Sequence, residues 1–100
     1  MYGLKQQDID LINGVFSSFS EVETVILYGS RAKGTFKLSS DIDFVLKGEK
    51  LNVTILNKIS WLLDDLLLPY TIDISIFHQL DNQDLINHIE RVGIVFSKKN

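Results

Sequence analysis

Two aspartates, Asp41 and Asp43, are separated by one apolar residue in a stretch that alternates apolar and polar side chains. Because successive side chains of a β-strand point to opposite faces, both carboxylates share one face if this stretch is a strand. Paired carboxylates supply the hard oxygen ligands that Mg²⁺ uses together with phosphate oxygens. Neither histidine nor cysteine stands beside them, which favours Mg²⁺ or Mn²⁺ over zinc. The alternative is the solvated face of an edge strand.

A third aspartate, Asp73, interrupts a strand-like stretch, residues 70–77, whose same-face positions are otherwise small or apolar. Taken alone, this aspartate is equally well explained by pairing with a neighbouring lysine. If its strand lies beside that of Asp41 and Asp43, three carboxylates converge. Like charges at such closeness are tolerated chiefly when a cation neutralises them. The geometry would then predict a metal site formed by all three aspartates.

The segment GSRAKG, residues 29–34, follows a strand-like run and is predicted to open a short helical turn. Glycine lets the backbone approach an oxygen closely, N–H groups at a helix start favour an anion, and the Ser30 hydroxyl is a further donor. Arg31 and Lys33 add positive charge. We interpret Gly29, Ser30, Arg31 and Lys33 as candidate phosphate-binding residues, the alternative being a surface turn with solvated basic side chains.

Helical and strand periodicities alternate around these residues and predict an α/β (α+β) chain. The predicted order is a helix over 5–19, a strand over 22–28, the turn, a strand over 41–47, a helix from the cap Asn52 to about residue 67, a strand over 70–77, a helix from the cap Asn82 to Arg91, and a strand over 94–96. Gly93 is expected to cap the last helix. His78 and His88 are expected on the surface, without chemistry.

The composition of the chain is that of one ordinary folded domain. Its 100 residues, 45% hydrophobic and 23% charged, predict a single domain over residues 1–100. A net charge of −3 argues against extended nucleic-acid binding, which needs clustered basic residues. The absence of cysteine excludes disulfides and thiolate metal sites. With no signal-peptide pattern and no long uninterrupted apolar run, we expect a cytoplasmic location and no membrane contact.

Together, Gly29-Ser30, a gap of ten residues, Asp41-Ile42-Asp43-Phe44 and the later Asp73 resemble the signature of the DNA polymerase beta nucleotidyltransferase superfamily. The string GSRAKGTFKLSSDIDF, residues 29–44, resembles the stand-alone minimal nucleotidyltransferase (MNT) domains in particular. The resemblance covers nearly the whole chain. It implies a polymerase beta-like fold, with helices packed on a single mixed β-sheet.

The resemblance also implies a role for each matching residue. Gly29 and Ser30 would hold the triphosphate of ATP or another nucleotide, with Arg31 and Lys33 as further phosphate contacts. The carboxylates of the three aspartates would hold two Mg²⁺, or Mn²⁺, with Asp73 completing the catalytic site. The implied reaction is transfer of a nucleoside monophosphate to an acceptor hydroxyl by in-line attack at the α-phosphorus.

Such domains resemble MntA-like antitoxins of HEPN/MNT toxin–antitoxin pairs. This implies transfer of AMP from ATP to a tyrosine of a small helical HEPN-type partner. Two alternatives stay open: a catalytically idle or binding-only antitoxin, and nucleotidylation of a small-molecule hydroxyl. Larger family members add a helical domain that closes over the nucleotide, and 100 residues cannot encode it. We therefore expect a partner to close the site, with Phe36 and Leu38 as candidate contacts unless they merely pack on the domain.

Overall fold

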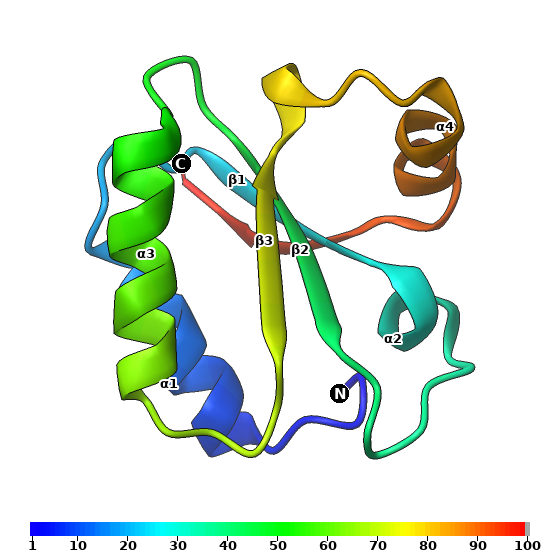
Figure 1. Ribbon diagram of the computed structural model, residues 1–100. Coiled ribbons are helices and arrows are strands. Elements are labelled where there is room, and N and C mark those ends of the chain that lie inside the picture. The colour runs from blue at the N-terminus through cyan, green and yellow to red at the C-terminus, as the bar shows by residue number, and fades with distance from the viewer. Residues whose placement is uncertain (100) are drawn as a thin grey trace.

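The structure, a computed structural model, describes residues 1–99 and has one four-stranded sheet with helices on both faces (Figure 1). In chain order the elements are α1 (Gln6–Ser17), β1 (Thr24–Tyr28), α2 (Gly29–Lys33), β2 (Ile42–Lys47), α3 (Val53–Asp65), β3 (Ile72–Ile76), the 3-10 turn η1 (Phe77–Gln79), α4 (Gln83–Val92) and β4 (Ile94–Lys98). The predicted order is confirmed, with element ends shifted by one or two residues, as expected where helices and strands fray.

The sheet is mixed, which confirms the expected fold class. Its strand order is β3-β2-β1-β4. β1 runs antiparallel to both β2 and β4, whereas β2 and β3 are parallel. Parallel neighbours need a crossover connection, and α3 provides it between β2 and β3. The strand that carries Asp73 therefore lies directly beside the strand that carries Asp43.

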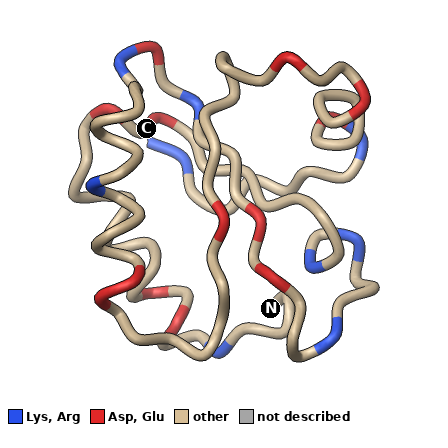
Figure 2. Tube along the Cα trace, in the orientation of Figure 1, with Lys and Arg blue, Asp and Glu red and all other residues tan. Residues whose placement is uncertain are grey.

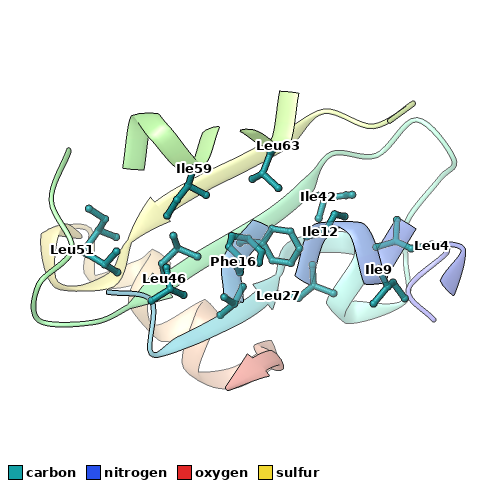
Figure 3. Packing of buried hydrophobic residues seen from close by; sticks show 14 residues of the cluster. Leu4, Ile9, Ile12, Phe16, Leu27, Ile42, Leu46, Leu51, Ile59 and Leu63 are labelled. Atoms are coloured by element: carbon teal, nitrogen blue, oxygen red, sulfur yellow. The ribbon is translucent and has the colours of Figure 1, made fainter. Parts of the chain in front are cut away.

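The core lies between the sheet and the pair α1 and α3. On β2, Ile42, Phe44 and Leu46 point into this layer and are fully buried. They meet apolar side chains from both helices, among them Phe16 of α1 and Ile59 and Leu63 of α3 (Figure 3). The Phe16 and Phe44 rings pack edge to face with centroids 5.3 Å apart. Since one face of β2 is occupied by the core, the alternate side chains of β2 must point to the other face.

Helices α2 and α4 lie on that opposite side of the sheet (Figure 1). Ile89 of α4 is buried there. Gly93 is the C-cap residue of α4, as predicted, but its φ of −62° is not left-handed. Glycine is needed for another reason, because a Cβ here would overlap the Ile89 carbonyl and lie 2.7 Å from Ile26 Cγ2. The close approach of α4 to β1 depends on this missing side chain.

Both helices with predicted asparagine caps begin where expected. The Asn52 side chain accepts a hydrogen bond from the Ile55 N–H at 2.9 Å, and Asn82 accepts one from Leu85 at 3.1 Å. Each cap satisfies one of the N–H groups that the first helical turn leaves unpaired.

Within residues 1–99, no helix is long and apolar enough to cross a bilayer.

Candidate active site

A row of polar side chains crosses three strands on the face opposite the core. Asp43 of β2 pairs with Asp73 of the parallel strand β3, and with Tyr28 of the antiparallel strand β1. Directly paired residues point to the same face of a sheet, so these three side chains are neighbours. Figure 2 shows the acidic segments of β2 and β3 side by side. The condition that the sequence left open, that the Asp73 strand lies beside the Asp43 strand, is therefore met.

Asp41 lies one residue before β2 begins, and its side chain is exposed. Burial raises the pKa of Asp43, and the negative charges of Asp73 and then Asp41 raise it further, while His88 opposes the rise. Asp73 and Asp41 are therefore both close enough to act on the Asp43 carboxylate. A bound cation would relieve this repulsion.

The turn at Gly29 packs directly against this carboxylate group. Gly29 has a φ of +76°, in the left-handed region that glycine adopts without strain. A Cβ at this position would overlap Asp43 Oδ2. Ser30 follows in α2 and is half-buried. The backbone that was predicted to hold phosphates and the carboxylates that were predicted to hold metal ions are therefore immediate neighbours.

The two basic residues of α2 lie in different environments. Lys33 is exposed and stays a candidate phosphate contact. Arg31, in contrast, is only 1% exposed, and its guanidinium donates hydrogen bonds to backbone carbonyls of Tyr2, Leu38 and Ser40. This placement speaks against the phosphate contact that we predicted for Arg31. The sequence alone does not distinguish Arg31 from Lys33, because both are basic residues next to a glycine turn.

His88 is a neighbour of the row that the sequence interpretation missed. We expected it on the outer surface of α4, but it is half-buried and its ring stands edge-on to Tyr28, with centroids 6.2 Å apart. No local pattern would have identified it, because its position depends on how α4 is placed over β1. His78 is exposed, as expected.

Tyr28 is the most enclosed polar group of the row. Burial raises the pKa of its hydroxyl; the nearby Ser75 hydroxyl opposes the rise, and the charges of Asp43 and Asp73 add to it. Ser75 Oγ is itself buried and makes no hydrogen bond of good geometry within residues 1–99. At neutral pH the Tyr28 hydroxyl is protonated and can donate a hydrogen bond.

The donor set fits an oxygen-ligated divalent cation, and it fits best when a second ligand binds with the cation. Within residues 1–99, no three His, Cys, Asp or Glu side chains lie close enough to hold a metal ion by themselves. Mg²⁺ ordinarily takes one or two carboxylates and completes its shell with water and substrate phosphates. The Asp43 carboxylate, which lies against the Gly29 backbone and is paired with Asp73 on the neighbouring strand, matches that requirement.

Solved structures with the same fold include toxin–antitoxin complexes. A crystal structure of a toxin–antitoxin with AMP-PNP has a TM-score of 0.74 and 17% identity, covering 92% of this chain and 74% of that one. A complex of a tri-AMPylated Shewanella oneidensis HEPN toxin with its MNT antitoxin has a TM-score of 0.70 and 14% identity, over 96% and 74% of the two chains.

A nucleotidyltransferase-like structure from Sulfolobus solfataricus has a TM-score of 0.53 and 23% identity, over 91% of this chain and 77% of that one. At these identities the likeness shows the fold alone. The comparison with curated proteins gives no match. The family described as Polymerase beta, Nucleotidyltransferase matches residues 10–100, which includes the Gly29 turn and all three aspartates. The chain therefore belongs to the polymerase beta nucleotidyltransferase family.

Proposed function

We propose that this chain is a Mg²⁺-dependent nucleotidyltransferase that transfers AMP from ATP to a tyrosine hydroxyl of a HEPN-type toxin, and thereby acts as an antitoxin. One observation carries the proposal. The backbone of Gly29 lies against the Asp43 carboxylate, which in turn pairs with Asp73 across β2 and β3. A triphosphate held at Gly29 and Ser30 would thus lie against carboxylates suited to the cations that accompany it.

The chain's own residues would act by positioning and by charge. The Gly29 backbone allows phosphate oxygens to approach, Ser30 would donate a hydrogen bond from its hydroxyl, and the exposed Lys33 would pair with the outer phosphates. Asp41 and Asp43 would hold the Mg²⁺ ions, with Asp73 completing the site. When bound, these ions supply a lowered pKa at the acceptor hydroxyl and charge neutralisation at the departing pyrophosphate.

In this proposal Asp73 would face the acceptor. It is the most outward of the row, on the edge strand β3, and its side chain is exposed. An incoming tyrosine hydroxyl that approaches from the β3 side would meet this carboxylate first, and a carboxylate oxygen can accept the hydrogen bond of that hydroxyl and orient it. The half-buried Tyr28 lies at the other end of the row, next to the phosphate turn.

The partner assignment is supported by the kind of complexes in which this fold is found. The two toxin–antitoxin structures described above have TM-scores of 0.74 and 0.70, and the second holds an AMPylated HEPN toxin. The exposed Asp41 and Asp73 leave the site open to water. Electrostatic stabilisation is weak in water and strengthens when a partner excludes it.

The test is to co-purify the chain with a HEPN-type toxin encoded beside it and to follow transfer of label from α-labelled ATP, GTP, CTP and UTP. We expect label from ATP on a toxin tyrosine, and its loss with Asp43→Asn. Tight binding of the toxin with no label from any nucleotide would instead indicate a binding-only antitoxin. Label on a small hydroxylated molecule but not on the toxin would contradict the proposed acceptor.

A further inference from the structure

We infer that Arg31 is a positioning residue that fixes the Gly29-Ser30 turn relative to the aspartates, and that a second turn at Gly3 is part of the same device. The inference rests on the proposed function, because what Arg31 positions is the nucleotide and metal site. Its evidence is the set of contacts around one buried guanidinium.

The guanidinium of Arg31 bridges two separate segments of backbone, the N-terminal turn and the loop before Asp41. Its Nε and Nη2 donate to the Ser40 carbonyl at 3.2 and 2.9 Å, Nη2 also donates to Leu38 at 3.4 Å, and Nη1 donates to the Tyr2 carbonyl at 2.9 Å. Burying a cation is costly unless its donors are satisfied. Here backbone carbonyl oxygens accept hydrogen bonds from the guanidinium. Movement of these segments away from Arg31 would therefore leave its buried charge without hydrogen-bond partners.

Aromatic rings and a glycine complete the enclosure. The guanidinium carbon lies 5.3 Å from the ring centroids of both Phe36 and Tyr70, within range for cation–π attraction. Gly3 has a φ of +73°, and a Cβ there would overlap the Phe36 ring and lie 2.9 Å from Arg31 Nη1. The Gly3 turn thus closes over Arg31 only because it lacks a side chain.

These contacts join the two halves of the proposed site. Arg31 directly follows Ser30 in α2, so its backbone moves with the phosphate-binding turn. Its main acceptor, Ser40, directly precedes Asp41, so that carbonyl moves with the start of the aspartate strand. The intervening loop, residues 34–41, carries no helix or strand. Arg31 therefore supplies the rigid link that the loop lacks.

A lysine cannot replace this link. Arginine presents up to five N–H donors in a planar fork, whereas lysine is a compact point charge on a flexible stem. Arg31→Lys would keep the charge but lose the simultaneous contacts to Tyr2, Leu38 and Ser40. Loss of a group that orients metal ligands commonly lowers metal affinity or activity by about 10- to 100-fold. We expect a decrease of this size in Mg²⁺–ATP affinity.

The experiment compares Arg31→Lys and Gly3→Ala with the core variant Ile59→Val, whose side chain lies on the opposite face of the sheet. Affinity for Mg²⁺ with a non-hydrolysable ATP analogue is measured by calorimetry at a temperature where circular dichroism shows each variant folded. Amide hydrogen exchange is followed in residues 35–41 without ligand. We expect Arg31→Lys and Gly3→Ala to lose affinity and to exchange faster in that loop, and Ile59→Val to do neither.

Each half of this result can overturn the inference. If Arg31→Lys and Gly3→Ala bind the nucleotide as the wild type does and lose only thermal stability, Arg31 is merely a structural residue. If Arg31→Lys does not fold, Gly3→Ala decides the question. If the wild type itself does not bind Mg²⁺–ATP, the proposed function fails, and exchange in residues 35–41 still decides whether Arg31 fixes this loop.

Discussion

At the scale of single residues, the fold holds Asp43 in an environment that disfavours the ionised form of its carboxyl group. Its pKa is raised above the ordinary 3.8, first by burial and then by Asp73 and Asp41. A carboxyl with a raised pKa in the folded state binds its proton more tightly there than in the unfolded chain. Stability is therefore lost as pH rises through this window, and the loss is complete above the folded-state pKa.

The first prediction follows from this loss of stability on ionisation of Asp43. Without nucleotide or metal at neutral pH, Asp43→Asn should unfold at a higher temperature than the wild type, because the amide removes the charge repulsion. The difference should disappear below pH 3.8, where the carboxyl is protonated in both the folded and the unfolded chain. Thermal unfolding by circular dichroism across this pH range measures it. The same variant should lose transfer activity, and a variant that is both active and unchanged in stability would contradict the metal assignment.

The second prediction uses two glycines with almost the same backbone conformation. Gly29 and Gly34 have φ values of +76° and +82°, but only at Gly29 would a Cβ overlap Asp43, since nothing lies within 4 Å of one at Gly34. Alanine at either position should cost about 1–2 kcal/mol of unfolding free energy from left-handed strain. Only Gly29→Ala should also displace the carboxylate and abolish the rise in melting temperature that Mg²⁺–ATP gives the wild type. An equal response of both variants to Mg²⁺–ATP would contradict the site.

At the scale of helices and strands, the sequence predicted those features that local periodicity determines, namely the elements and the faces to which their side chains point. The alternation around Asp43 and Asp73 predicted their faces because a strand's side chains repeat every second residue. Arg31 and Lys33 could not be told apart, since which side of α2 enters the protein depends on the loop before Asp41 and on the Gly3 turn. His88 was misplaced for the same reason, because the docking of α4 on β1 is a tertiary contact.

The third prediction compares the two asparagine caps. Asn52→Ala and Asn82→Ala each remove one side-chain acceptor at a helix start and should each cost about 1 kcal/mol of unfolding free energy. α3 covers the core face, whereas α4 carries His88 against Tyr28. Asn82→Ala should therefore also weaken Mg²⁺–ATP binding, and Asn52→Ala should not. Urea unfolding gives the stabilities, and calorimetry gives the affinities. The reverse pattern would mean that α4 does not contribute to the site.

At the scale of the whole molecule, the sheet buries one face in the core and leaves the aspartate end of the other face accessible. Of the two residues that we considered as partner contacts, Phe36 packs against the Arg31 guanidinium and is half-buried. The packing interpretation therefore applies to Phe36. Leu38, two residues on in the same loop, is 86% exposed. A large apolar side chain held at this exposure beside a charged site is a candidate contact for a protein partner.

The last prediction is that the chain alone transfers nucleotide poorly and that Leu38 helps bind the toxin that completes the site. A partner interface of standard size buries roughly 1,600 Å² in total, and truncation of a well-packed contact costs more than about 1 kcal/mol of binding free energy. Leu38→Ala should weaken toxin binding by at least about fivefold, as 1 kcal/mol requires, and leave thermal stability unchanged, because the side chain makes little contact within the chain.

Trp61→Ala is the matched control, since Trp61 is 67% exposed on α3, which covers the opposite face of the sheet. Toxin affinity and transfer rate are measured for both variants beside the wild type. If Trp61→Ala weakens binding and Leu38→Ala does not, the toxin binds the helical face, and closure of the aspartate site must have another source. Full transfer by the lone chain to a free hydroxyl acceptor, with no gain on adding the toxin, would remove the need for closure altogether.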